Sequence, residues 1–166
     1  MPELSLYLVN FNDEKDILAV SFFIGINLFA QTDINEDFES NNTEYAWFAD
    51  DAQMDTHFSN PQQNAPNNSN YVLQYEDVGE NFANVGFDYG ESFNLAGTHQ
   101  FSLMIYVPSS TITGNSPNQI SLKLQNTNIA APWSTQTEII KAISLDQWQT
   151  VTFDFNNDNY INLDPN

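Results

Sequence analysis

The sequence predicts an all-β fold, a two-sheet antiparallel β-sandwich. Apolar and polar residues alternate over several short segments, and Asn, Gly, Pro and Ser fill the intervals between them. No segment shows the three- and four-residue apolar spacing of an amphipathic helix. The length of 166 residues, of which 41% are hydrophobic, suits one domain with a core.

Three segments carry the clearest alternation, and each is predicted to be a strand with one apolar face. They are Gln100–Val107, Gln119–Gln125 and Gln149–Phe155. Pro108 ends the first of them, because proline cannot donate to a strand ladder.

Five weaker segments complete the predicted set of strands. They are Ile34–Glu39, Tyr45–Ala49, Asn70–Glu76, Phe82–Tyr89 and Glu138–Leu145. The stretch Asp50–Ser69 is rich in Asn, Gln and Pro, which favour turns, and it is predicted to be the longest loop.

Residues 1–30 are predicted to be a leader, and residues 31–166 the folded domain. The apolar run Ile17–Ala30 is shorter than the roughly 20 residues of a membrane span but matches a signal-peptide core. A signal peptide normally begins with a basic segment, but the residues upstream of this run are mainly acidic. Residues 1–14 are therefore interpreted as a wrongly assigned start of the protein or as a divergent leader. The alternative is a buried pair of core strands. The leader hypothesis implies a secreted or cell-surface protein whose mature chain has no membrane span.

The charge balance excludes several classes of partner. The chain has 22 acidic residues and three lysines, a formal net charge of −19. Nucleic acids and anionic membranes require basic surfaces, so neither is expected as a partner. The absence of cysteine excludes disulfides, thiolate catalysis and cysteine-based zinc sites.

No catalytic residue is predicted. The sequence has no G-x-S-x-G, no H-E-x-x-H and no phosphate-binding glycine motif. Its two histidines, His57 and His99, fall in a predicted loop and at the head of a predicted strand. The acidic residues allow many carboxylate pairs of the kind that glycoside hydrolases use, but none lies in a recognisable motif.

Asp37 and Glu39 are candidate ligands for a structural calcium ion. Both would point away from Phe38 on one face of a strand, where two carboxylates repel unless a cation lies between them. Asp154 and Asp164 could join them from the far end of the chain. The alternative is a solvated acidic edge strand.

Two tryptophans are candidate carbohydrate-binding residues, because flat aromatic rings stack on the apolar faces of sugars. Trp133 lies in a predicted loop, where it either binds a ligand or anchors the loop. Trp47 lies in a predicted strand and either stacks on a ligand or packs in the core. Trp148 starts a strand and is expected to be structural.

The order of strands and loops resembles the galactose-binding-like jelly roll. More narrowly, it resembles the carbohydrate-binding modules attached to secreted, polysaccharide-degrading proteins of bacteria. The stretches that carry this resemblance are DFE (37–39), NPQQNAPNNSNYVLQYE (60–76), FANVGFDYG (82–90), FSLMIYVPSSTITG (101–114), QISLKLQN (119–126) and LDQWQTVTFDF (145–155).

The resemblance implies a module that binds a glycan without cleaving it and holds a structural calcium ion near Asp37 and Glu39. It also implies one more strand, which we expect beyond Asn166. We therefore expect a non-catalytic domain that docks a secreted enzyme or surface protein on a polysaccharide, and the acidic chain favours a neutral glycan. The alternatives are a spacer or adhesion sandwich without a ligand, and a small polysaccharide lyase or hydrolase.

Overall fold

The computed structural model describes residues 5–9, 34–78, 83–90, 93–97 and 99–163, and these residues confirm the all-β sandwich. The strands are β1 (Ser5–Val9), β2 (Trp47–Asp50), β3 (Ala52–Ser59), β4 (Tyr71–Asp77), β5 (Asn84–Phe87), β6 (Gln100–Tyr106), β7 (Gln119–Leu124), β8 (Thr137–Ala142), β9 (Gln149–Asp154) and β10 (Ile161–Asn162). Two short 3₁₀ helices, η1 (Ser109–Thr111) and η2 (Pro132–Thr135), interrupt the loops. Within the described ranges no helix has the length and apolar character of a membrane span.

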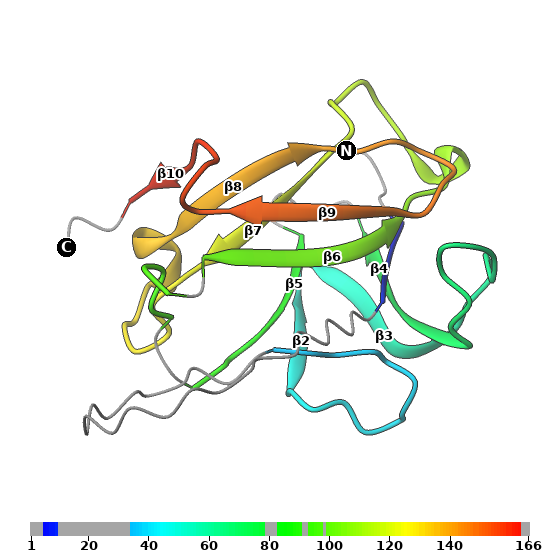
Figure 1. Cartoon of the computed structure of the whole chain (residues 1–166), viewed down its shortest axis with the longest axis horizontal. Coiled ribbons are helices and arrows are strands. Elements are labelled where there is room, and N and C mark those ends of the chain that lie inside the picture. The colour runs from blue at the N-terminus through cyan, green and yellow to red at the C-terminus, as the bar shows by residue number, and fades with distance from the viewer. Residues whose placement is uncertain (1–4, 10–33, 79–82, 91–92, 98, 164–166) are drawn as a thin grey trace, which may run out of the picture.

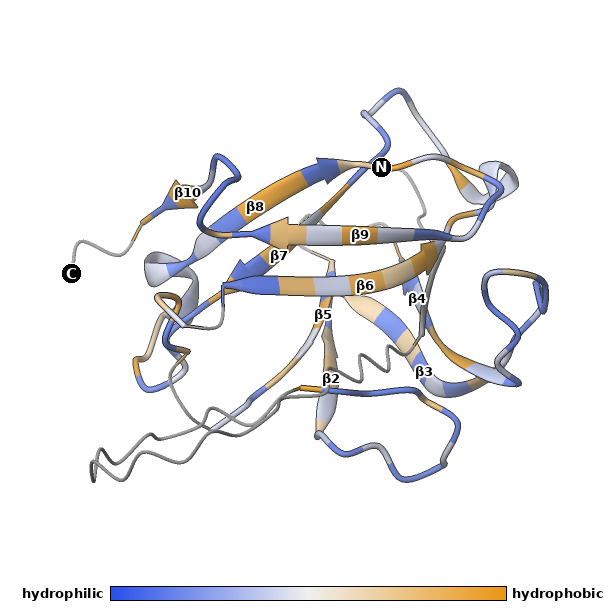
Figure 2. Ribbon diagram, in the orientation of Figure 1, coloured by the Kyte–Doolittle hydropathy of each residue, from blue (hydrophilic) through white to orange (hydrophobic). Residues whose placement is uncertain are grey.

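The strands form one large sheet and two smaller ladders, all antiparallel. The large sheet has the order β3-β4-β1-β6-β9, and the smaller ladders have the orders β10-β8-β7 and β2-β5. In Figure 1, β6 and β9 run side by side across the front of the molecule, and β10 lies at one end with the C-terminus. Figure 2 shows that hydrophobic segments concentrate on the strands and hydrophilic segments in the loops.

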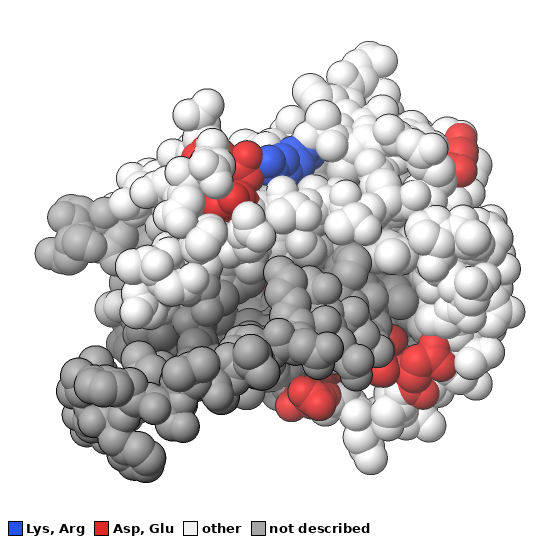
Figure 3. Space-filling view, in the orientation of Figure 1, with Lys and Arg blue, Asp and Glu red and all other residues white. Residues whose placement is uncertain are grey.

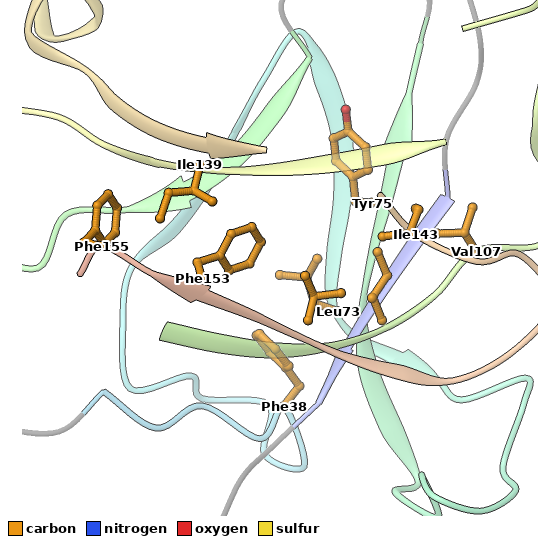
Figure 4. Close-up of a cluster of buried hydrophobic side chains, with 10 residues drawn as sticks. Phe38, Leu73, Tyr75, Val107, Ile139, Ile143, Phe153 and Phe155 are labelled. Atoms are coloured by element: carbon orange, nitrogen blue, oxygen red, sulfur yellow. The ribbon is translucent and has the colours of Figure 1, made fainter. Parts of the chain in front are cut away.

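The main core lies between the large sheet and the two smaller ladders. Figure 4 shows its side chains converging from both sides. Its buried members are Phe38, Leu73, Tyr75, Ile105, Val107, Ile139, Ile143, Val151, Phe153 and Phe155. Half-buried apolar residues of β2, β5 and β7 pack against this cluster, so all three sheets share one core. Burial of this apolar surface is the main source of stability for such a fold.

A second, smaller core covers the other face of the large sheet. Met104 and Tyr106 of β6 pack there with Val72 and Trp148. The indole N–H of Trp148 donates to the carbonyl oxygen of Gln62 at 2.7 Å, which fixes the Asn-rich loop over this face. The end of β6 is therefore buried on both faces.

Most of the predicted strands are confirmed. The three clearest segments correspond to β6, β7 and β9, and four of the weaker ones to β2, β4, β5 and β8. The prediction of a loop across Asp50–Ser69 is wrong for its first half, which forms β3. β3 contains many polar residues, some of them at half-buried positions, so its sequence does not show the apolar face that marks the other strands.

The prediction of a strand at Ile34–Glu39 is wrong. Phe38 has a φ of 56°, which breaks the extended conformation, yet its side chain is only 2% exposed. The main-chain N–H of Glu39 donates to the Asp37 carboxylate at 3.0 Å, which closes a tight turn. Phe38, the apolar residue on which the strand prediction rests, therefore packs in the core from a turn.

The proposed leader overlaps the described residues only at β1, which pairs with β4 and β6. The apolar run Ile17–Ala30 lies outside the described residues. The boundary at residue 30 and the last strand expected beyond Asn166 therefore stay predictions.

Candidate functional site

A cleft of about 850 Å³ opens between the β2-β5 ladder and β7, with β4 and β6 contributing residues beneath them. All four residues of β5 and all six of β7 line it. These two strands are not paired with each other in the described part of the chain, so the side of the sandwich opposite the large sheet is split between them. The split gives access to side chains that a closed sheet would cover.

Aromatic rings make up a large part of the apolar lining of the cleft. The lining includes Phe38, Trp47, Phe48, Tyr75, Phe87, Tyr89, Phe93 and Phe101. Several of these rings are in mutual contact: the Trp47 and Phe87 ring centroids lie 4.8 Å apart, and Tyr89 stacks on Phe93 at 4.9 Å. Such contacts hold the rings in place and so present a rigid apolar surface.

Phe48 is the most accessible aromatic residue of this lining, with 50% of its surface exposed. It is paired across the ladder with Gly86, and its ring reaches over the glycine. A Cβ atom at position 86 would lie 3.3 Å from the ring atom Cζ. Gly86 therefore leaves the space that the Phe48 ring occupies.

The cleft is nearly neutral although the chain is strongly acidic. Among its described lining residues only Glu36, Asp88 and Lys123 carry a charge. The Glu36 carboxylate accepts from the N–H groups of Phe38 and Glu44, and the Asp88 carboxylate accepts from the N–H of Gly90. Both carboxylates therefore already accept hydrogen bonds from nearby main-chain N–H groups.

The remaining polar lining consists of amides and hydroxyls. These residues include Asn35, Asn84, Ser102, Gln119, Ser121, Gln125, Asn126, Thr127, Asn128, Thr135 and Thr137. Tyr75 adds another hydroxyl. Burial, with a smaller contribution from Asp77, raises the pKa of Tyr75 to about 12.

The structure separates the two predicted binding tryptophans. Trp47 lines the cleft, where its half-buried ring packs on Phe38 and Phe87. Its buried indole N–H has no hydrogen-bond partner among the residues that the structure describes, which is unusual for a buried donor. Trp133 lies on η2, is 65% exposed and does not line the cleft. The binding role of either residue stays a prediction.

The carboxylates of the predicted calcium ligands are engaged with the protein. Glu39 accepts from the N–H groups of Asn70 and Tyr71 at 2.7 and 3.3 Å, and from the Asn70 side-chain amide at 3.1 Å. Asp37 accepts from the N–H of Glu39. These hydrogen bonds account for the position of Glu39 without a cation, and a calcium ion held by Asp37 and Glu39 stays a prediction. Asp164, a further candidate ligand, lies outside the described residues.

A second acidic cluster surrounds Asp154, at the end of β9. Its carboxylate accepts from the side-chain amides of Asn157 and Gln100 and from the N–H of Asn156. These bonds lower the pKa of Asp154 to about 2, and the bond from the Asn157 amide has the largest effect. The neighbouring Asp158 pairs with Lys141. No group of three metal-binding side chains occurs among the described residues.

The two histidines have structural contacts. The His57 ring stacks on Tyr71 with centroids 3.7 Å apart, and its Nδ1 lies 3.2 Å from the carbonyl oxygen of Phe38. His99 lies just before β6, as predicted, and its carbonyl oxygen accepts from the N–H of Phe155. Neither histidine lines the cleft.

Sequence reasoning missed Phe48, Tyr89 and Phe93 as candidate site residues. Phe87 and Tyr89 alternate within a predicted strand, and Phe48 adjoins Trp47 in another, so the aromatic enrichment of both segments was visible. Phe48 and Phe87 come together because β2 pairs with β5. This contact joins segments far apart in the sequence, so the local pattern of residues does not reveal it.

The chain matches a known protein family over most of its length. A family model described as "Carbohydrate binding domain" matches residues 31–162, a range that contains every described residue of the cleft. No curated protein and no solved structure matches the chain.

Proposed function

This chain belongs to the carbohydrate binding domain family, and from that premise we propose that it docks a larger secreted protein on a neutral polysaccharide. Carbohydrate binding is the function that family membership supports. Modules of this kind are typically non-catalytic, and we propose the same for this chain. The proposed ligand site is the cleft between β5 and β7.

The observation that carries the proposal is the nearly neutral, aromatic and amide-rich lining of the cleft in a chain of net charge −19. Apolar rings complement the C–H faces of sugar rings, and amide and hydroxyl groups can bond to sugar hydroxyls. Ligand sites commonly combine a largely apolar wall with a few polar groups in this way. A neutral glycan avoids the repulsion that the acidic chain would exert on an anionic one.

The surface charge is consistent with the same proposal. Figure 3 shows a face on which a small basic patch adjoins acidic atoms, while most of the described surface is uncharged. Among the described lysines, Lys141 is held by Asp158, and Lys123 lies in the cleft. The described part of the chain thus offers little basic surface to attract a polyanion.

Affinity gel electrophoresis against a panel of soluble polysaccharides tests the proposal. The panel contains hydroxyethyl cellulose, mixed-linkage β-glucan, xylan and agarose as neutral or weakly charged glycans, and alginate as a polyanion. We expect retardation by at least one neutral glycan and none by alginate. Migration unchanged by every glycan, with the chain folded, would contradict the proposal.

The two alternative functions are distinguished in the same assays. A spacer without a ligand predicts no retardation, and burial of both Trp47 and Trp133 would favour it, but Trp133 is 65% exposed. A lyase or hydrolase predicts release of unsaturated products or reducing ends from a retarding glycan. We expect neither product to accumulate above the level in a protein-free control.

A further inference from the structure

One backbone edge of β7 is not paired with any described strand and faces the cleft. It pairs with β8 on one side, from Gln119↔Ala142 to Leu124↔Thr137, and no other described strand pairs with it. Every residue of β7 lines the cleft. The free edge of the strand is therefore part of the cleft wall.

The register identifies which main-chain groups lie on that edge. Just before β7, the carbonyl oxygen of Asn118 accepts from the N–H of Ile143 at 3.1 Å, which continues the ladder by one pair. In an antiparallel ladder the bonded positions alternate along each strand. The main-chain groups of Ile120, Leu122 and Leu124 therefore face β8, and those of Gln119, Ser121 and Lys123 face the cleft.

These three residues have no described partner for their N–H and C=O groups. Main-chain amides bond strongly to water or to any suitable partner, so an open edge is a ready binding surface. Alternate residues of a strand lie about 6.6–6.8 Å apart, which makes the edge a regular series of donors and acceptors. The aromatic residues of the β2-β5 ladder line the same cleft.

We infer that the glycan bonds directly to the main-chain groups of Gln119, Ser121 and Lys123, an inference that rests on the function proposed above. Sugar hydroxyls both donate and accept, so they can satisfy the alternating N–H and C=O groups of this edge. The neutral lining favours an uncharged chain of hydroxyls over a charged peptide as the occupant. Side-chain chemistry at these three positions then matters less than the backbone.

Amide hydrogen exchange of the full chain, followed by NMR, reads this edge directly. Without glycan, the amides of Ser121 and Lys123 should exchange rapidly, while those of Ile120 and Leu122 should be protected by β8. With the neutral polysaccharide that retards the chain in the gel, exchange at Ser121 and Lys123 should slow at least tenfold. Protection of both amides without glycan would overturn the inference, because another segment would then occupy the edge.

Ser121→Pro supplies a second test. Proline removes the cleft-facing N–H, and edge strands tolerate it where no ladder bond is lost. Ser121→Ala, which keeps the N–H and removes only the hydroxyl, is the matched control. Both variants lack the Ser121 hydroxyl, so they differ at the main-chain N–H, and we expect S121P to bind about tenfold more weakly than S121A at similar melting temperatures.

The outcomes separate this inference from the proposed function. Wild-type binding with unprotected Ser121 and Lys123 amides, or a folded S121P variant that binds normally, overturns only the role of the edge. Failure of the wild type to bind any glycan overturns the proposed function and the inference together. If S121P does not fold, the exchange experiment on the wild type still decides.

Discussion

The ring of Phe48 lies over Gly86 on the paired strand, so close that a Cβ atom on residue 86 would stand 3.3 Å from the ring. Half of the Phe48 surface remains exposed, and the residue lines the cleft. A glycine at position 86 thus fixes where the most accessible aromatic ring of the cleft can lie.

Gly86→Ala should weaken glycan binding several-fold with little change in melting temperature. The new methyl group would push the half-exposed Phe48 ring by a few tenths of an ångström and change the surface that a sugar meets. Gly97→Ala is the matched control, because a Cβ there would make only ordinary contact, 3.7 Å from the Asn94 carbonyl oxygen. Equal affinities of G86A and G97A would remove the role assigned to Gly86.

Phe48→Ala should lower affinity about tenfold, equivalent to roughly 1.4 kcal/mol of binding free energy. Trp133→Ala is the informative comparison, since Trp133 is exposed but lies outside the cleft lining. Binding through the cleft predicts that W133A keeps its affinity, as measured by titration calorimetry. A larger loss for W133A than for F48A would move the site to the η2 loop and support the tryptophan prediction made from the sequence.

The sequence was sufficient to predict the strands in which alternation marks a buried face, and β6, β7 and β9 are found where expected. It misled at Phe38, because a buried aromatic residue can enter a core from a turn as well as from a strand. It concealed β3, whose half-buried positions include polar residues.

The candidate site was predictable only in part. The sequence predicts a binding role for both Trp47 and Trp133, but only Trp47 lines the cleft. The cleft itself depends on the β2-β5 pairing and on the split between β5 and β7. The free edge of β7 depends on register, which no local pattern of side chains specifies.

Glu39→Gln should destabilise the fold by about 0.5–1.5 kcal/mol, the net contribution of a typical hydrogen bond, because two of the three bonds that Glu39 accepts come from exposed Asn70. Glutamine has one oxygen in place of two. Its NH₂ group would face either the N–H groups of Asn70 and Tyr71 or the side-chain amide of Asn70, and the bonds at that position would be lost. Chemical denaturation with and without EDTA separates this role from the predicted calcium site. The hydrogen-bond account predicts the same loss in both conditions; a loss only without EDTA, together with a lower wild-type stability in EDTA, would support calcium.

Asp154→Asn should remove a pH-dependent contribution to stability. Hydrogen bonds from Asn157, Gln100 and Asn156 lower the pKa of Asp154 from 3.8 to about 2 in the folded state. A lowered pKa means that the ionised group stabilises the fold above the unfolded pKa and that this contribution disappears as the pH falls. The stability difference between wild type and D154N should therefore be constant above about pH 5 and shrink between about pH 4 and pH 2. A difference independent of pH across that window would contradict this assignment.

The central claim is that the cleft between β5 and β7 binds carbohydrate, and amide chemical-shift mapping of the full chain with the retarding neutral polysaccharide tests it most directly. We predict that the largest shifts fall on residues 84–90 of β5 and its following turn and on residues 119–128 of β7 and its following loop. Shifts confined to η2 and its neighbours, or none with any glycan of the panel, would contradict the claim.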